Sequence, residues 1–293
     1  MTKERRAFWD SIIGSIILFT MTFISWLLLS AFDTIPALFT DSNPALYTVL
    51  RYAIKFYQVI FCVVFMLIYK PDRPLFSKIC PGGGNTIKNV LIGLALGLGT
   101  NLLCAFVSIL RGDISLYYSA PNWFYILLCV IGVLIQTGAE EYVCRFFLYQ
   151  HLYRGYKGPW AAIIVPSMIF SLLHFSNPGA DVITGIHSFV IGVVWSLMVY
   201  VFDSFYMAWA YHFIWNYTQS IILGLPNSGL VFPLSIFKLE AATAEKAIAY
   251  DPVYGIEGSL LALICNILLM LVLLYFAIKK RKAEKSASLE NDD

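Results

Sequence analysis

Residues 123–152 read WFYILLCVIGVLIQTGAEEYVCRFFLYQHL. The first part of this stretch is almost wholly apolar, and the apolar character resumes after two adjacent glutamates. A helix needs about 20 mainly apolar residues to cross a bilayer. Because lipid offers backbone groups no solvent partner, an isolated segment of this kind crosses as a helix. The stretch therefore predicts a transmembrane helix that carries two carboxyl groups into the membrane.

The composition extends this reading to the whole chain. Of the 293 residues, 59% are apolar and 13% are charged, and the mean hydropathy is +0.73. Soluble domains are about 45–50% apolar, so we expect an all-α polytopic membrane protein in one membrane domain, 1–293, with a bundle of about eight transmembrane helices. The predicted spans are 9–32, 46–69, 87–110, 123–152, 159–175, 180–201, 204–223 and 258–278.

Basic residues in short loops predict the orientation of the spans. Lys and Arg cluster before the first span, after the second, after the fourth and after the eighth, whereas the intervening loops contain few of them. This alternation predicts a multi-pass protein of the cell membrane with both termini in the cytoplasm. The net charge of +2 reflects these loops and gives no reason to expect nucleic acid as a partner.

Two regions are predicted to lie outside the bundle. The external loop 226–257 contains an amphipathic stretch, Phe232 to Ile248, which favours a helix lying on the external face. The polar tail 283–293 is expected to be disordered. The six cysteines are scattered without paired metal-ligand spacing, so we read them as small buried apolar side chains.

The ionisable groups inside the spans are the candidates for function. An ionised side chain near the bilayer centre costs about 2.5–3.5 kcal/mol on insertion scales. On the fourth span, Glu141 and Arg145 are four residues apart, so they share a helix face and can form an ion pair. Glu140 is rotated from Glu141 by about 100° and is the carboxylate most able to face a cavity. A purely structural Glu141–Arg145 pair is an equal alternative.

Three further polar residues lie at similar heights in the predicted bundle. His212 and Asn216 are four residues apart on the seventh span, and both side chains can donate a hydrogen bond to an oxyanion. His174 ends the fifth span. A single buried histidine is more often a helix-to-helix contact than a catalyst, and we read His187 as structural or interfacial. The joint occurrence of two glutamates, two histidines and an asparagine favours one site.

These residues resemble the CPBP family of intramembrane endopeptidases, which includes type II CAAX prenyl endopeptidases and Abi bacteriocin-immunity proteins. The three motifs of that family occur in order, as Glu140-Glu141-Tyr-Val-Cys-Arg145, Phe170-Ser-Leu-Leu-His174 and His212-Phe-Ile-Trp-Asn216. The likeness covers 123–220, a four-helix catalytic core. Relatives commonly have a small residue after the arginine of the first motif, whereas this chain has Phe146.

The resemblance implies a glutamate-type peptidase without a cofactor. Glu140 and His174 would activate water, His212 and Asn216 would stabilise the oxyanion, and Glu141 and Arg145 would hold the geometry. Zinc is the alternative, with Glu140, His174 and His212 as ligands and an open position for water. The H-E-x-x-H zinc motif is absent from the sequence.

Three functions therefore remain open. The first is hydrolysis of a peptide bond in a membrane-anchored or membrane-adjacent protein or peptide, which through the resemblance includes lipidated CAAX-type substrates. The second is a non-hydrolytic bacteriocin-immunity or partner-binding protein on the same scaffold. The third is a transporter in which the glutamates and histidines form a proton relay. The motif positions favour the first, and the absence of an evident inverted repeat counts against the third.

Overall fold

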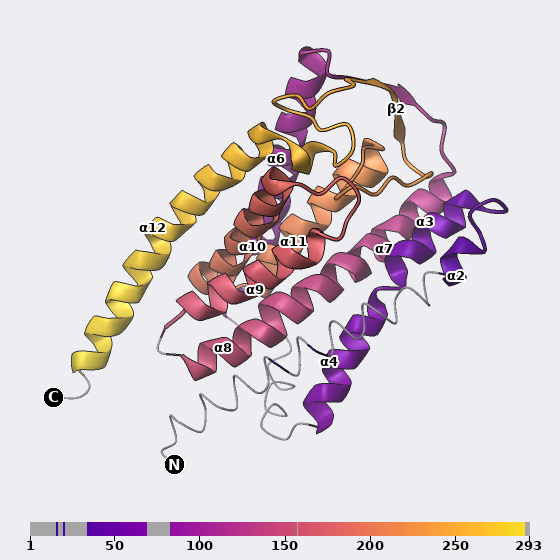
Figure 1. The fold of residues 1–293 in the computed structure, drawn as a ribbon. Coiled ribbons are helices and arrows are strands. Elements are labelled where there is room, and N and C mark those ends of the chain that lie inside the picture. The colour runs from indigo at the N-terminus through magenta and orange to yellow at the C-terminus, as the bar shows by residue number, and fades with distance from the viewer. Residues whose placement is uncertain (1–15, 17–19, 21–33, 69–82, 157, 291–293) are drawn as a thin grey trace.

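The computed structural model describes residues 16, 20, 34–68, 83–156 and 158–290. The predicted first span, 9–32, lies almost wholly outside the described residues. The helices of the described part pack into one bundle, which is covered at one end by a small sheet (Figure 1). The helical bounds are α2 Thr34–Ala37, α3 Pro44–Ala53, α4 Phe56–Ile68, α6 Ile87–Leu110, α7 Trp123–Glu141, α8 Tyr149–Gly155, α9 Trp160–His174, α10 Val182–Phe202, α11 Phe205–Asn216 and α12 Leu260–Glu290.

Two π-helical segments and one 3-10 turn complete the helices. The segment η2, Tyr142–Leu148, joins α7 to α8 without a break, and η3, Tyr217–Ile222, continues α11. The 3-10 turn η4, Ile256–Gly258, precedes α12. A π-helix has i→i+5 hydrogen bonds and is rare outside functional regions. Each π segment here begins directly after a residue that the motifs single out, Glu141 in α7 and Asn216 in α11.

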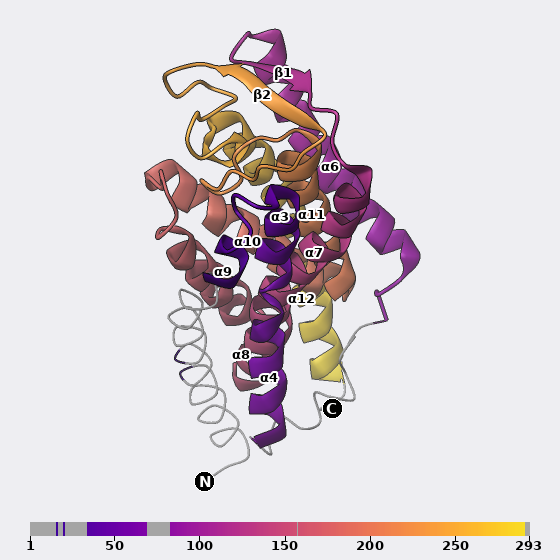
Figure 2. The same cartoon turned by 90° about the vertical axis from the view of Figure 1, so that its right-hand side faces the viewer.

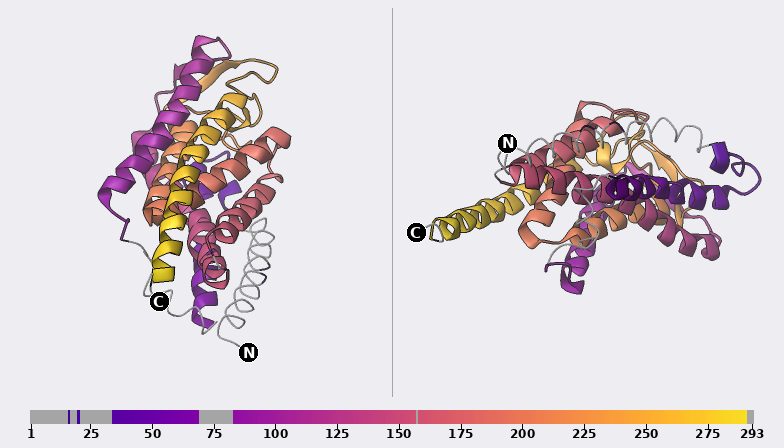
Figure 3. Two further views of the ribbon diagram at one scale, coloured as in Figure 1. Left: turned by 90° about the vertical axis from the view of Figure 1, so that its left-hand side faces the viewer. Right: turned by 90° about the horizontal axis from the view of Figure 1, so that it is seen from below.

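The prediction of an all-α polytopic membrane protein is confirmed. Four helices of the described residues have the length and apolar character of a membrane span, and they occupy α6, the continuous helix 123–155, α10 and the greater part of α12. Of the apolar window in α10, 72% is buried, against 28% in α6 and in α12. The helix α10 is therefore the centre of the bundle, and α6 and α12 present most of their apolar surface outward. Figure 3 shows α12, in yellow, on the outside of the bundle.

Close packing fixes α11, which carries two of the motif residues. A Cβ atom added at Gly97 of α6 would lie 2.6 Å from the carbonyl oxygen of Tyr211, and one added at Gly93 would meet the carbonyl of Met207 even more closely. Glycines spaced by four residues allow two helix backbones to approach in this way. The pair Gly93 and Gly97 thus sets the position of α11 against α6.

The second predicted span is divided into two helices. The helix α3 ends at Ala53 and α4 begins at Phe56, although Ile54 and Lys55 are not helix breakers. Irregular backbone at membrane depth is tolerated where it lines a cavity. Lys55 and Arg51 both line the central cavity.

The amphipathic helix predicted in the external loop is wrong. The segment Phe237–Ala242 is the strand β2, which pairs antiparallel with β1, Ile114–Tyr118. This sheet lies at one end of the bundle, and the C-terminal ends of α4 and α12 lie at the other (Figure 2). Pairing with β1 gives the backbone of β2 its hydrogen bonds, and this tertiary contact overrides the local helical preference.

The disordered tail is also corrected. The helix α12 continues to Glu290, so most of 283–293 is helical. Its residues include strong helix formers, and Arg281 pairs with Glu284 at 3.4 Å. The Tyr200 hydroxyl of α10 donates to Glu284 over 2.8 Å, and Lys280 donates to the Tyr200 carbonyl over 2.7 Å. These contacts anchor the extension of α12 to α10.

Candidate active site

The two adjacent glutamates of α7 point in different directions, as their helical rotation predicts. The Glu140 side chain is 21% exposed and lines a cavity of about 190 Å³ at the centre of the bundle. Gln136, one turn earlier, donates from Nε2 to Oε1 of Glu140 over 2.6 Å. Glu140 is therefore a carboxylate that faces open space and has one oxygen held in place.

Glu141 is fully buried and connects two helices. Its Oε1 atom accepts from Nη1 of Arg145 over 3.0 Å and from Nδ1 of His212 over 2.9 Å. The Arg145 guanidinium lies 4.7 Å from the ring centroid of Phe170 and 5.0 Å from that of Trp195, where cation–π attraction stabilises a buried cation. The pair is thus more than a support for its own helix, because it also orients the imidazole of α11.

His212 is held on three sides. Its ring stacks on Trp195, with centroids 4.2 Å apart and an interplanar angle of 19°. An ionised carboxylate only accepts hydrogen bonds, so the contact with Glu141 places a proton on Nδ1. The other nitrogen, Nε2, lies 3.3 Å from Nδ2 of Asn216 and 3.8 Å from Oε2 of Glu140. Nε2 is therefore the atom that faces Asn216 and Glu140.

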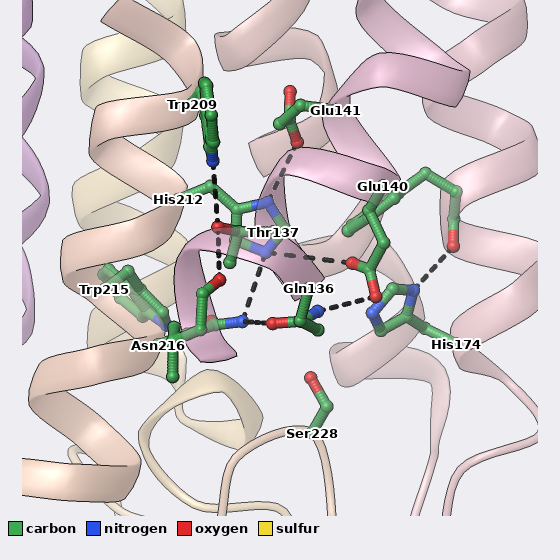
Figure 4. A network of polar contacts seen from close by, with 12 residues as sticks. Gln136, Thr137, Glu140, Glu141, His174, Trp209, His212, Trp215, Asn216 and Ser228 are labelled. Carbon is green, nitrogen blue, oxygen red and sulfur yellow. Dashed lines mark hydrogen bonds and ion pairs between the residues drawn. The ribbon is translucent and has the colours of Figure 1, made fainter. Parts of the chain in front are cut away.

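Asn216 completes a closed set of contacts. Its Nδ2 atom donates to Oε1 of Gln136 over 3.1 Å and lies against Nε2 of His212. Figure 4 shows these side chains converging from α7 and α11 on one region of the structure. The helix spacing that put His212 and Asn216 on one face in the sequence also places both beside Glu140.

His174 approaches the same region from α9. Its Nδ1 atom contacts the carbonyl oxygen of Phe170 at 2.8 Å, which requires a proton on Nδ1. Nε2 points toward the Glu140 carboxylate in Figure 4, and both residues line the cavity. The structure therefore brings all six motif residues together: Glu140, His174, His212 and Asn216 line the cavity, and Glu141 and Arg145 lie behind His212.

The loop between η3 and α12 forms one wall of the cavity. Glu257 accepts from Nε1 of Trp215 over 2.9 Å, and from the backbone N–H and hydroxyl of Ser228 over 2.8 and 2.6 Å. All three residues line the cavity. Trp215 is the neighbour of Asn216 on α11, so Glu257 fixes the loop to the helix that carries the site.

An ion-pair cluster holds the outer side of the same loop. Lys246 lies 2.7 Å from Asp181, the N-cap of α10, and 3.0 Å from Asp251. Burial is the largest single effect on the pKa of Asp181 and would raise it, but the hydrogen bonds from Lys246 and Thr184 and the charge of Lys246 together outweigh burial, and the pKa falls below the usual value. The same contacts raise the pKa of Lys246 against the opposing effect of burial. Both shifts indicate that the folded loop favours the charged pair.

Other polar residues near the cavity were missed or given a structural role from the sequence. Gln136 could have been found, because it is a polar residue one turn before Glu140 in an apolar span. Trp195 and Glu257 carry no comparable signal, because their roles depend on contacts between distant segments. His187, which the sequence predicts to be structural or interfacial, accepts from Nδ2 of Asn266 over 3.1 Å and also lines the cavity.

The donor set of two imidazoles and one carboxylate suits zinc in kind, but the arrangement does not fit it. The amide of Asn216 is directed at Nε2 of His212, and the amide of Gln136 is directed at Glu140. These contacts occupy lone pairs that a metal would need. Within the described part of the chain, no group of three or more His, Cys, Asp or Glu residues is placed to hold a metal ion.

Comparison with known proteins places the network in a wider context. Residues 121–218 match the model of a family described as type II CAAX prenyl endopeptidase, Rce1-like. The matched segment contains the six motif residues as well as Gln136 and Trp195. Neither the curated proteins nor the solved structures contain a match to this chain.

Proposed function

We propose that the protein is a glutamate-type intramembrane endopeptidase, starting from the match of residues 121–218 to the family described as type II CAAX prenyl endopeptidase, Rce1-like. This match confirms the resemblance drawn from the three motifs and supports a membrane protease in general. The proposal adds the catalytic residues, the mechanism and the class of substrate. The observation that carries it is the convergence of Glu140, His212 and Asn216 on one cavity within the bundle.

In this mechanism a water molecule between Glu140 and His174 attacks the carbonyl carbon of the scissile peptide bond. Glu140 takes a proton from the water as the carbon–oxygen bond forms. The carbonyl oxygen becomes an oxyanion, which accepts hydrogen bonds from Asn216 and His212. The carbon–nitrogen bond then breaks, and Glu140 returns the proton to the leaving amine. A positioned acid and base of this kind contributes about 10²–10⁴-fold to the rate.

His212 must carry a second proton to donate to the oxyanion. Its Nδ1 proton is used by Glu141, so the donor is an imidazolium with a proton on Nε2. Such an imidazolium would lie between the carboxylates of Glu141 and Glu140, at 2.9 and 3.8 Å. Two opposite charges at these distances stabilise the cation in a buried setting.

The substrate is a peptide bond in a membrane-anchored or membrane-adjacent protein or peptide, with prenylated CAAX-type peptides as the first class to test. The depth of the cavity among spanning helices supports a substrate held at the membrane. The mechanism requires no cofactor, and the arrangement of the amides supports that reading over zinc. We also propose that both termini are cytoplasmic, from the distribution of Lys and Arg in the loops.

The test is cleavage of reporter peptides, prenylated and unprenylated, by the purified full-length protein in detergent. Glu140→Gln should abolish cleavage and leave the protein folded, and His212→Ala should lower the rate by about 10²–10³-fold, the usual cost of removing an oxyanion donor. Glu284→Gln, which alters a carboxylate at the far end of α10 and α12, is the control. Loss of wild-type cleavage on addition of a zinc chelator would overturn the metal-independent mechanism.

If no peptide is cleaved under conditions where the protein is folded, the endopeptidase proposal fails. The non-hydrolytic immunity or partner-binding function would then be preferred, and it requires Glu140→Gln and His212→Ala to retain that function. A carrier would instead move protons across vesicles in a manner that depends on Glu140.

A further inference from the structure

Three side chains form a continuous chain of contacts between the two adjacent glutamates. Gln136, Asn216 and His212, which we call the amide chain, link Glu140 at one end to Glu141 at the other. The four contacts measure 2.6, 3.1, 3.3 and 2.9 Å in order from Glu140. Gln136 is the member that no catalytic role in the proposed mechanism accounts for.

The carboxylate ends determine which way each group in the amide chain must point. An ionised Glu140 only accepts hydrogen bonds, so Gln136 must turn its NH₂ group toward it. The carbonyl oxygen of Gln136 then faces Asn216, and an oxygen needs a donor. Asn216 must therefore present its own NH₂ group to Gln136. This orientation follows from the chemistry of the groups, independently of which amide atom is drawn as nitrogen.

The same argument applies from the other end. Glu141 accepts from Arg145 and from Nδ1 of His212, so in a neutral His212 the atom Nε2 has a lone pair and no proton. That lone pair accepts from the second N–H of Asn216. Both ends thus require the same direction of Asn216, with its NH₂ group toward the catalytic atoms.

We propose that Gln136 is a positioning residue that couples the general base to the oxyanion site. One side of its carboxamide holds Oε1 of Glu140, which leaves Oε2 for the water. The other side prevents the carboxamide of Asn216 from rotating by 180°, which would turn an oxygen acceptor toward the oxyanion. This role rests on the proposed endopeptidase function and adds to it the means by which base and oxyanion donors are kept in register.

The amide chain also restricts when Asn216 can act. With His212 neutral, both N–H bonds of Asn216 are used, one by Gln136 and one by His212. Once Nε2 of His212 has taken up a proton from the bulk solvent, it no longer accepts from Asn216. Nε2–H of His212 and the freed N–H of Asn216 can then both turn to the substrate oxygen, while Gln136 continues to hold the other N–H.

The test compares two variants of Gln136 with a matched control. Gln136→Met keeps the length of the side chain and removes both hydrogen bonds. Gln136→Glu keeps an acceptor for Asn216 but replaces the donor to Glu140 with a second carboxylate. The control is Gln219→Met, because Gln219 is also a buried glutamine of this region. Its side chain is bonded to Asn101 at 3.0 Å and to the Pro226 carbonyl at 2.6 Å, and neither partner belongs to the amide chain.

We expect Gln136→Met and Gln136→Glu to lower kcat by roughly 100-fold, the usual effect of small misplacement of catalytic groups, with KM changed by less than about 3-fold. A peptide phosphonate that mimics the tetrahedral oxyanion should bind each variant more weakly by a similar factor. A peptide with a reduced, uncleavable amide should bind them as it binds wild type. Gln219→Met should lower thermal stability with kcat of the folded protein near that of wild type.

The inference is overturned if a folded Gln136→Met protein keeps kcat within about 3-fold of wild type, or if only KM changes. It is also overturned if phosphonate and reduced peptide lose affinity equally. These outcomes differ from failure of the proposed function, in which wild type itself does not cleave or Glu140→Gln cleaves as well as wild type. If Gln136→Met does not fold, Gln136→Glu decides, since it keeps the length and the acceptor.

Discussion

The buried ion pair behind His212 gives the sharpest test of how this site is held together. Arg145 and Glu141 are both 0% exposed and lie 3.0 Å apart. Replacing Arg145 with Met keeps most of the side-chain volume and leaves a buried carboxylate with His212 as its remaining partner. Removal of one member of a buried pair costs about 3–5 kcal/mol, and loss of the cation–π contacts with Phe170 and Trp195 is included in that range.

The matching substitution Glu141→Gln should also be costly, because it leaves the Arg145 cation without its carboxylate. The double variant is expected to recover much of the loss, since apolar or neutral replacement of a whole buried pair is often close to neutral. The coupling energy in the double-mutant cycle should therefore be at least about 2 kcal/mol, well above the limit of about 0.5 kcal/mol for independent sites.

The assay is unfolding of the purified protein in mixed micelles with a rising fraction of denaturing detergent, followed by tryptophan fluorescence. The same samples should be assayed for cleavage, because His212 loses its charged acceptor in Glu141→Gln and keeps it in Arg145→Met. The reasoning is refuted if Arg145→Met loses less than about 1 kcal/mol, or if the two single losses add in the double variant.

Three further predictions follow from contacts outside the catalytic groups. Gly192→Ala places a Cβ atom 2.9 Å from the buried guanidinium of Arg145, so the free energy of unfolding should fall by about 1–3 kcal/mol. The control is Gly99→Ala, whose added Cβ atom has nothing within 4 Å, and it should show no such loss in the same unfolding assay. Glu257→Gln should lower the free energy of unfolding by about 2 kcal/mol, because its three donors lose a charged acceptor. Amide hydrogen exchange in residues 226–257 should become faster in this variant. Unchanged exchange would contradict the proposed anchoring of the loop. Lys246→Met should lower stability near neutral pH by no more than about 1 kcal/mol, since the pair is partly exposed. The pKa of Asp181 is lowered from 3.8, so the stability that its ionised carboxylate contributes to the folded protein is present above pH 3.8 and is lost on acidification. The pKa of Lys246 is raised from 10.5, so the stability that its ammonium group contributes to the folded protein is present below pH 10.5 and is lost at higher pH. The stabilities of variant and wild type should therefore converge at both extremes, and a constant difference across pH would count against the ion pair.

The fold was predictable wherever one apolar run of membrane length lies between polar caps. The third, sixth and seventh predicted spans agree within two residues with α6, α10 and the continuous helix α11–η3, in that order. These helices begin after the N-cap residues Thr86, Asp181 and Ser204. The break between α3 and α4 was not predictable, because Ile54 and Lys55 do not disfavour a helix. It depends on the cavity beside them, which no local pattern reveals.

The site was predictable to the extent that its residues share a helix. The spacing of His212 and Asn216, and that of Glu141 and Arg145, determines which side chains are neighbours along one helix. The contact of Glu141 with His212 joins α7 to α11 and could not be read from spacing. Membership of the network was therefore accessible from sequence, whereas the donors and acceptors within it required the packing of the bundle.

The two π-helical segments have a consequence for how chains of this kind can vary. An i→i+5 turn accommodates one residue more than an α-helical turn over the same path. The turns at 142–148 and 217–222 begin directly after Glu141 and Asn216. A related chain could therefore gain or lose a single residue in either segment and still present both side chains at the same height. Changes in chain length among relatives should gather at these two places, and alignments that force gaps elsewhere in α7 or α11 would misplace the site.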